Sequence, residues 1–283
     1  MFDLASALPE KATGRTETRK SFLERAGEST TRAVSDSLAM LSFVGEIAIA
    51  LGRLTAGRAR MRRRDIALFL QEAGAEALPI VSLISFLVGV ILAFIGAIQL
   101  SQFGAQIYVA NLVALAMTRE MGAMMTAIIM AGRTGAAFAA QLGTMTVNEE
   151  VDALRTTGVS PIEHLVLPRL IALSLMMPLL ALYSDFLGIL GGALVGVGTL
   201  DISFVQYYEQ TRAALGPLPF ILGLIKAGVY GVVVAVAGCY YGMSSGRSAA
   251  AVGSAVTSAV VMGILLIIIS SAVTTILYNQ LGI

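Results

Sequence analysis

The sequence predicts an all-α integral membrane protein, and two features of its composition support this prediction. Of its 283 residues, 57% are hydrophobic and 13% are charged, whereas soluble domains carry about 25% charged residues. The charges are also unevenly placed, because residues 1–72 hold 12 of the 19 Lys and Arg and 9 of the 18 Asp and Glu. The rest of the chain is too poor in charge for a water-exposed surface, but it suits a surface in contact with lipid.

The N-terminal part divides into a tail and an amphipathic helix. Residues 1–35 are rich in Glu, Arg, Lys, Ser and Thr, which predicts a polar cytoplasmic tail. Over residues 36–61 apolar side chains recur at helical spacing, and several arginines lie between Arg58 and Arg64. This pattern favours an interfacial helix on an anionic membrane surface. A soluble amphipathic helix packed against a partner is the alternative.

About five membrane-spanning helices are expected after this segment. No charged residue occurs between Ala77 and Thr118, a run that is long enough for two spans of about 20 residues each. Because cytoplasmic loops are enriched in Lys and Arg, the arginine cluster places the N-terminus in the cytoplasm, and five spans then place the C-terminus on the opposite side. The expected spans are residues 78–100, 107–131, 166–194, 217–243 and 255–279.

Most catalytic chemistries are excluded by the scarcity of reactive side chains. The chain has one cysteine and one histidine, so neither a disulfide framework nor a Cys- or His-rich metal site is expected. No G-K-[ST] sequence accompanies the glycine-rich residues 188–198, which excludes a phosphate-binding loop. Residues 242–246 have the spacing of a nucleophile elbow, but they occur at a helix end without a triad histidine. We therefore expect no enzymatic activity, metal or cofactor in this chain.

Ionisable residues inside the expected spans are candidates for function. Arg119 and Glu120 lie in the second span, Arg133 lies nearer its cytoplasmic end, and Lys226 lies in the fourth. Such residues cost several kcal/mol unless they are paired or face a wet cavity. Ion pairing between helices, with Glu120 and Lys226 as the expected pair, is weighed about equally with a role in a cavity. Arg119 is adjacent to Glu120 and is expected to point to a different side of the helix.

Residues 146–160 predict a short cytoplasmic helix between the second and third spans. Thr146 or Asn148 is expected to cap its start, and acidic residues suit its first turn. A rigid helix joined directly to two spans can transmit a push from a soluble partner. Its acidic surface, formed by Glu149, Glu150 and Asp152, is the expected contact with that partner.

Four short motifs occur in a fixed order from the second span to the start of the third, within residues 119–172. They are Arg119-Glu120-Met121-Gly122, Ala131-Gly132-Arg133, Glu149-Glu150-Val151-Asp152-Ala153-Leu154 and Pro168-Arg169. In sequence and spacing they closely resemble the motifs of MlaE-type permeases. These are the membrane subunits of ABC transporters that work with MCE-domain proteins, and the similarity extends over about residues 36–283.

The resemblance implies a permease of the bacterial inner membrane that moves lipid, usually phospholipid, between the inner and outer membranes and supports outer-membrane lipid asymmetry. It implies a homodimer bound to two separate ABC ATPase subunits in the cytoplasm and to an MCE-protein hexamer in the periplasm. Some relatives also involve a STAS domain, and nucleic acid is not expected. The lipid pocket would lie between the two permease copies, around the first and fifth spans.

The resemblance also assigns roles to individual residues. Polar groups near the lipid path would be Arg119, Glu120 and Lys226. The helix that couples to the ATPase, residues 148–157, would act through Glu149, Glu150, Asp152, Leu154 and Arg155. Residues with a packing or structural role would be Gly132, Arg133, Pro168 and Arg169.

Several positions depart from the family pattern. Ala123 replaces a common proline, and Gln141 replaces a common glutamate. Ser258 and Ser271 stand where many relatives carry Arg and Asp. An ion-coupled secondary transporter that uses the intramembrane Arg119, Glu120 and Lys226 is the alternative function, but it would not need the cytoplasmic helix.

Overall fold

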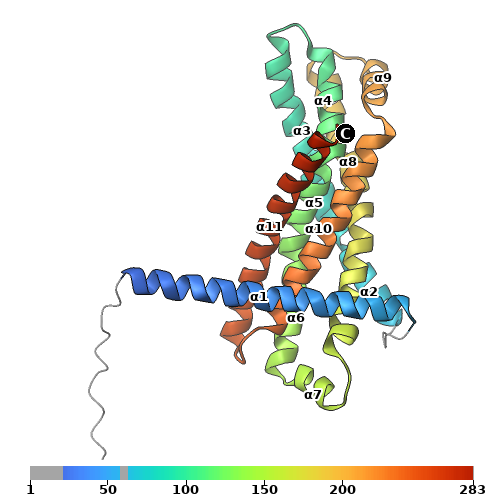
Figure 1. Ribbon diagram of the computed structural model, residues 1–283. Helices are drawn as coiled ribbons and strands as arrows, with labels where there is room; N and C mark the ends of the chain where they lie inside the picture. The colour runs from blue at the N-terminus through green and yellow to red at the C-terminus, as the bar shows by residue number, and fades with distance from the viewer. Residues whose placement is uncertain (1–21, 58–62, 283) are drawn as a thin grey trace, which may run out of the picture. The chain divides into compact units, whose positions relative to one another are not determined.

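The computed structural model describes residues 22–57 and 63–282, and these residues form helices with no β-strand among them (Figure 1). The predicted all-α class is therefore confirmed. The α-helices are α1 (Phe22–Thr55), α2 (Arg63–Ala73), α3 (Leu78–Ser101), α4 (Val109–Ala116), α5 (Gly122–Met130), α6 (Ala136–Val147), α7 (Glu150–Thr156), α8 (Leu167–Thr199), α9 (Phe204–Ala214), α10 (Pro217–Met243) and α11 (Ala249–Gln280).

The chain divides into two compact units within α1, between Val44 and Gly45. In the first unit, the described residues 22–44 are helical, and Leu38 and Leu41 are exposed on this helix. Residues 1–21 of the expected tail, and Arg58, Arg60 and Arg62 of the arginine cluster, lie outside the described residues. The second unit holds the end of α1 and every other described helix.

Six helical stretches in the described residues are long and apolar enough to cross a membrane. Five of them contain the five expected spans. The sixth, Val34–Thr55, lies where the interfacial helix is expected, and its length and composition would also allow a span. The five stretches that match the expected spans are Arg64–Ser101, Gln106–Val147, Ile162–Thr199, Pro217–Met243 and Ala249–Gln280.

The helical stretch that carries the second span is longer than the sequence predicted. Two π-helical segments, Met117–Met121 and Ala131–Gly135, join α4, α5 and α6 end to end. Helical structure therefore continues to Val147, whereas the second span was predicted to end at about residue 131. Short π-helical segments are frequent at functional sites, and these two contain the intramembrane charges of the second span.

Small residues let the long helices approach closely, as expected for helices packed in a membrane. A Cβ atom added to Gly89 of α3 would lie 1.9 Å from the carbonyl oxygen of Gly188 in α8. On α10, a Cβ added to Gly238 would lie 2.7 Å from the carbonyl oxygen of Gly135. The backbones of α3, α8, α10 and the π-helical segment before α6 thus touch without intervening side chains.

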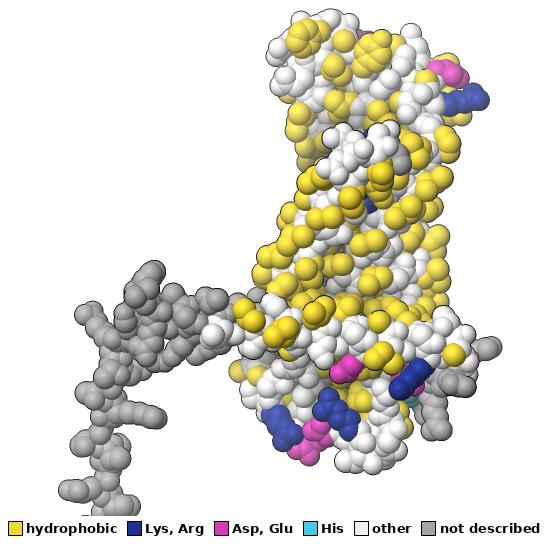
Figure 2. Space-filling model, in the orientation of Figure 1, with side chains coloured by type: hydrophobic (Ala, Val, Ile, Leu, Met, Phe, Trp, Pro, Cys, Tyr) yellow, Lys and Arg dark blue, Asp and Glu magenta, His cyan; other side chains and the backbone are white. Residues whose placement is uncertain are grey.

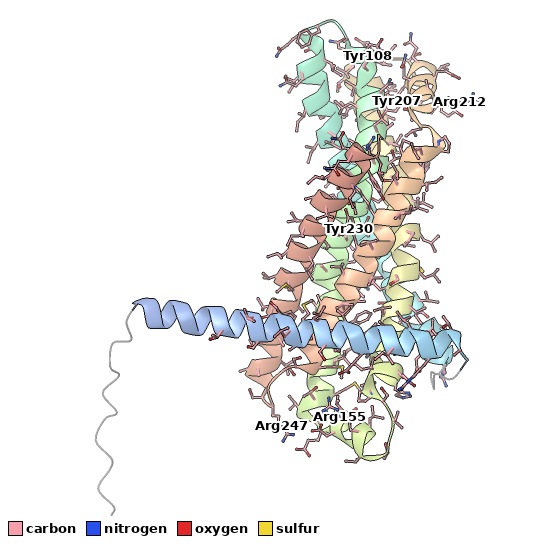
Figure 3. All side chains as sticks on the ribbon, viewed as in Figure 1. Tyr108, Arg155, Tyr207, Arg212, Tyr230 and Arg247 are labelled. Atoms are coloured by element: carbon pink, nitrogen blue, oxygen red, sulfur yellow. The ribbon has the colours of Figure 1, made fainter. Side chains whose placement is uncertain are left out.

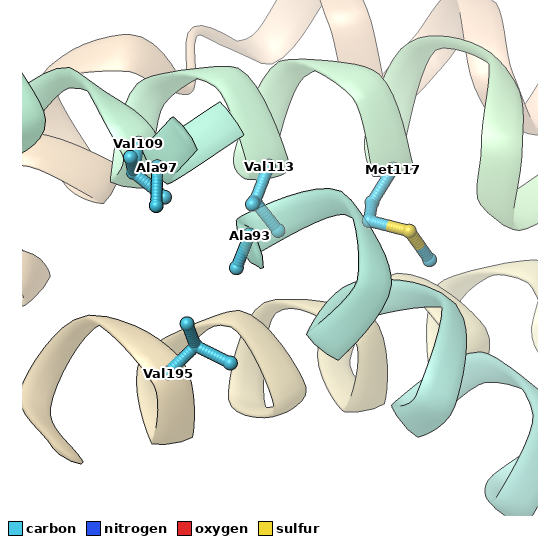
Figure 4. Packing of buried hydrophobic residues seen from close by; sticks show 6 residues of the cluster. All are labelled: Ala93, Ala97, Val109, Val113, Met117 and Val195. Atoms are coloured by element: carbon cyan, nitrogen blue, oxygen red, sulfur yellow. The ribbon is translucent and has the colours of Figure 1, made fainter. Parts of the chain in front are cut away.

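Apolar side chains fill the remaining space between the helices. One buried cluster joins α3, α4 and α8, and in Figure 4 its side chains point toward one another between these helices. Figure 2 shows hydrophobic side chains along the middle of the second unit and charged side chains toward its two ends, as expected for a surface in contact with lipid. The cluster consists of Ala93, Ala97, Val109, Val113, Met117 and Val195.

Candidate functional site: a polar network beside an open groove

A buried ion pair joins the second and fourth spans. The ammonium group of Lys226, on α10, is 1% exposed and donates a hydrogen bond to Oε2 of Glu120. It also donates to Oγ1 of Thr275, 2.8 Å away on α11. A lysine buried without such partners would be very costly. The pair expected from the sequence is present, and a third helix contributes to it.

Glu120 is the centre of this network. Ser271 donates a hydrogen bond to its Oε1, and Thr275 donates one to its Oε2 over 3.3 Å. The carboxylate thus holds three helical segments together: the π-helical segment Met117–Met121, α10 and α11. Ser271 contributes a hydroxyl group, not a charge, to this network.

An open groove of about 680 Å³ lies beside the network. Glu120, whose side chain is 22% exposed, borders this groove, whereas Lys226 does not. Arg119 borders the same groove, so both neighbours contribute to its lining. Both lie in a π-helical segment, whose turn is wider than that of an α-helix. The full lining is Leu115, Ala116, Arg119, Glu120, Met124, Ser271, Ala272, Thr275 and Ile276.

Ion pairing and a polar cavity, weighed as alternatives from the sequence, therefore occur together. One side of Glu120 holds the buried cation, and the other reaches the groove. The groove combines aliphatic side chains, which suit hydrocarbon, with a guanidinium and a carboxylate, which suit a polar head group.

Arg133 fastens the second span to α2. Its Nη1 donates to the backbone oxygen of Glu72 over 2.8 Å, and its Nη2 lies 3.0 Å from Oε2 of Glu76. These contacts hold the π-helical segment Ala131–Gly135 against the region where α2 ends. Arg133 does not take part in the Glu120 network.

The neighbouring Gly132 does not bring helices together within this chain. It is exposed, and a Cβ added to it would meet no heavy atom within 4 Å. The close approach to α10 occurs one turn later, at Gly135. The motif Ala131-Gly132-Arg133 lies close to this contact with α10, but the glycine that makes the contact is Gly135.

Arg169 is a buried cation, 5% exposed, in the first turn of α8 beside the buried Pro168. Its guanidinium lies 4.4 Å from the ring centre of Phe69 on α2, a cation–π geometry. It donates to the carbonyl oxygen of Leu165 over 2.7 Å and to Oε1 of Gln141 over 3.1 Å. Arg169 thereby connects α2, α6 and α8, and its partner on α6 is the neutral amide of Gln141.

Replacing Gln141 by Glu is expected to raise stability by up to about 1 kcal/mol, because an exposed carboxylate would turn the hydrogen bond from Arg169 into an ion pair. The melting temperature of the purified protein measures the effect. Gln141→Leu, which removes the acceptor, is the matched control and should lower it. A lower melting temperature for Gln141→Glu than for the unmodified chain would contradict the assigned contact.

The segment between the second and third spans forms the expected short helix, α7, but its start differs from the prediction. Neither Thr146 nor Asn148 caps it. The Thr146 hydroxyl donates back to the carbonyl oxygen of Leu142 over 2.9 Å, and Asn148 donates to the side chain of Glu150. Glu149 precedes the helix with a left-handed backbone, φ 60°. Side chains other than glycine adopt this conformation infrequently, and here it produces the sharp turn between α6 and α7.

The acidic surface of α7 is partly used within the chain. Arg247, in the loop between α10 and α11, lies 3.1 Å from Oδ2 of Asp152 and 3.6 Å from Oε1 of Glu149. Arg155 lies 3.3 Å from the other oxygen of Asp152. Figure 3 shows Arg155 and Arg247 at the same end of the second unit. Of the three acidic residues, Glu150 is the one without an ion pair in the described structure, and Leu154 is half-buried on the same helix.

Sequence reasoning missed two buried acidic groups. Glu163, in the π-helical segment before α8, pairs with Arg53 over 3.0 Å. Asp185, in the middle of α8, is buried without an ion pair in the described structure. A single carboxylate within a long apolar run is the signal that could have identified Asp185.

Comparisons with known proteins place this geometry in context. The family model described as "Permease MlaE" matches residues 68–277, which include the network, the groove and α7. A probable ABC transporter permease protein of Rickettsia conorii is 42% identical over 205 residues, covering 72% of this chain and 79% of the relative. One of Synechocystis is 33% identical over 212 residues, covering 75% and 81%. An intermembrane phospholipid transport system permease protein of Haemophilus influenzae is 33% identical over 162 residues, covering 57% and 62%.

Proposed function

Because the chain belongs to the MlaE family of ABC transporter permeases, we propose that it is the membrane subunit that moves phospholipid between the inner and outer membranes, driven by a separate ATPase. The family match covers both the Glu120 groove and the cytoplasmic helix α7, and this observation carries the proposal. A relative in Haemophilus influenzae is named for intermembrane phospholipid transport.

The groove provides the chemistry that a phospholipid requires. Its aliphatic lining suits acyl chains, and Arg119 at its border suits a phosphate, which Arg recognises well. The carboxylate of Glu120 adds a hydrogen-bond acceptor for the head group. Because Glu120 also binds Lys226, Ser271 and Thr275, a shift of α10 or α11 would change the polar border of the groove.

Coupling to the ATPase is proposed to pass through α7. This helix follows α6 directly, and Arg247 connects it to the loop before α11. A push on α7 can therefore reach α11, which carries Ser271 and Thr275 at the groove. The chain has no phosphate-binding sequence of its own, so the proposed energy source is the partner subunit.

The proposed assembly follows the family. It comprises a homodimer in the bacterial inner membrane with the N-terminus in the cytoplasm, two ATPase subunits, and an MCE-domain hexamer on the periplasmic side, where the C-terminus would lie. A STAS-domain subunit would be a further cytoplasmic partner.

Reversing the charge of Glu150 to Lys is expected to weaken co-purification of the ATPase several-fold without lowering the melting temperature. Glu150 is exposed and has no internal ion pair in the described structure, and the one internal contact that the change removes is the exposed hydrogen bond from Asn148. Glu209→Lys, on the exposed surface of α9, is the matched control. Full recovery of ATPase with Glu150→Lys would contradict the assignment of α7.

The lipid assignment is tested by purifying the complex in mild detergent and identifying co-extracted lipid by mass spectrometry. Phospholipid is expected at a fixed ratio to the protein. Filling the groove by Ala272→Phe, at an exposed lining position, should lower that ratio, whereas Ala249→Phe at the far end of α11 should not. A ratio that is unaffected by Ala272→Phe would contradict a lipid site in this groove.

A further inference from the structure

A second cavity, of about 460 Å³, lies between α8, α9 and the start of α10. It shares no lining residue with the Glu120 groove, and its volume is within the range of small-molecule sites, about 300–1,000 Å³. Its lining is almost wholly aliphatic and aromatic, with one carboxyl group. The lining residues are Leu182, Asp185, Phe186, Ile189, Leu190, Ala193, Phe204, Tyr207, Tyr208, Thr211, Leu215 and Phe220.

Asp185 is the acidic residue among those that line this cavity and is 4% exposed. Its Oδ1 is enclosed without a hydrogen-bond partner, and no ion pair of the described residues includes it. This same oxygen packs against Gly122, where an added Cβ would lie 1.8 Å from Oδ1, so Oδ2, which is not fully enclosed, is the oxygen available to the cavity. The backbone thus fixes the carboxyl in place and provides it with no partner.

The polar groups around Asp185 do not neutralise it. The cavity lining contains no Lys, Arg or His. The hydroxyl of Tyr207 donates to the carbonyl oxygen of Ile189 over 3.2 Å, and burial raises the pKa of this tyrosine to about 12. Tyr207 is therefore a neutral group that is already engaged. A buried acidic group without a partner is costly, and a bound cation would remove that cost.

We propose that this cavity binds a long-chain amphiphile with a primary amine head, with the ammonium group on Asp185 and the hydrocarbon against the apolar lining. The carboxyl group of Asp185 favours an amine head group on the ligand. The length of the apolar lining favours a long hydrocarbon tail. Along α8, Asp185, Ile189 and Ala193 occupy one face over two turns, a distance of about 12 Å at 1.5 Å per residue. This site is separate from the proposed transport groove and does not depend on it.

The test uses the full chain in lipid nanodiscs and a long-chain primary alkylamine that carries a photoreactive diazirine on its tail. Cross-linking should map to α8 and α9, and the matched long-chain alcohol and carboxylic acid should label these helices about tenfold less, because a charge-assisted hydrogen bond is lost. Asp185→Asn, which keeps the shape, should reduce amine labelling by a similar factor.

A second pair of variants separates binding in the cavity from loss of folding. Ala193→Phe fills this cavity and should abolish labelling, whereas Ala272→Phe fills the other groove and should leave it unchanged. Equal labelling by amine, alcohol and acid would overturn the proposal. The proposal would also be overturned if the amine still labelled both Asp185→Asn and Ala193→Phe, and both variants melted at the temperature of the unmodified chain.

Discussion

Replacing Glu120 by Ala is expected to lower the stability of the chain by about 3–5 kcal/mol, the cost of removing one partner from a buried ion pair. The buried ammonium group of Lys226 would lose its carboxylate, and Ser271 would lose its acceptor. Thermal melting of the purified protein measures the effect.

The double variant Glu120→Leu with Lys226→Met is the informative control. Replacing a buried ion pair by apolar groups of similar volume is often nearly neutral, so this variant should melt near the unmodified protein. It should nevertheless lose lipid transfer, because the groove loses its carboxylate. If the double variant melted as low as Glu120→Ala, the unpaired charge of Lys226 would not be the cause of the lower stability of Glu120→Ala.

Replacing Gly89 by Ala is expected to destabilise the protein by at least about 1–3 kcal/mol, the usual cost of overpacking. The added Cβ would lie 1.9 Å from the backbone oxygen of Gly188, and a backbone atom cannot rotate away. Gly96→Ala on the same helix is the matched control, because its Cβ would meet Leu112 at an ordinary 3.4 Å.

The Gly96 variant should match the unmodified protein or exceed its stability, because Ala is a better helix former than Gly. Melting curves of the two variants in the same detergent provide the comparison. Equal stability of Gly89→Ala and Gly96→Ala would contradict the close crossing of α3 and α8.

The features predicted correctly from the sequence are those that any protein needs in order to be stable in a lipid bilayer. A long run without charges requires spans, and a lysine inside a span requires a partner, so the ion pair of Lys226 with Glu120 could be predicted from the scarcity of other charges. The short helix between the second and third spans could be predicted from a polar segment that lies between apolar ones.

The features that the sequence did not predict depend on backbone geometry. Apolar periodicity does not reveal a π-helical segment, so the segment Met117–Met121 and the continuation of helix to Val147 were missed. The pairing of Arg247 with Asp152 joins residues that are 95 positions apart, and it could not be predicted without the fold. For the same reason the motif could not distinguish the exposed Gly132 from the packed Gly135.

The central claim is that this chain moves phospholipid with energy from ATP hydrolysed by a partner subunit. The most direct test reconstitutes the co-purified complex in proteoliposomes and measures transfer of labelled phospholipid with ATP, without ATP, and with an imposed proton or sodium gradient alone. The account predicts transfer that requires ATP and is lost in the Glu120→Leu/Lys226→Met variant. Transfer driven by the ion gradient without ATP would contradict it and would support an ion-coupled carrier instead.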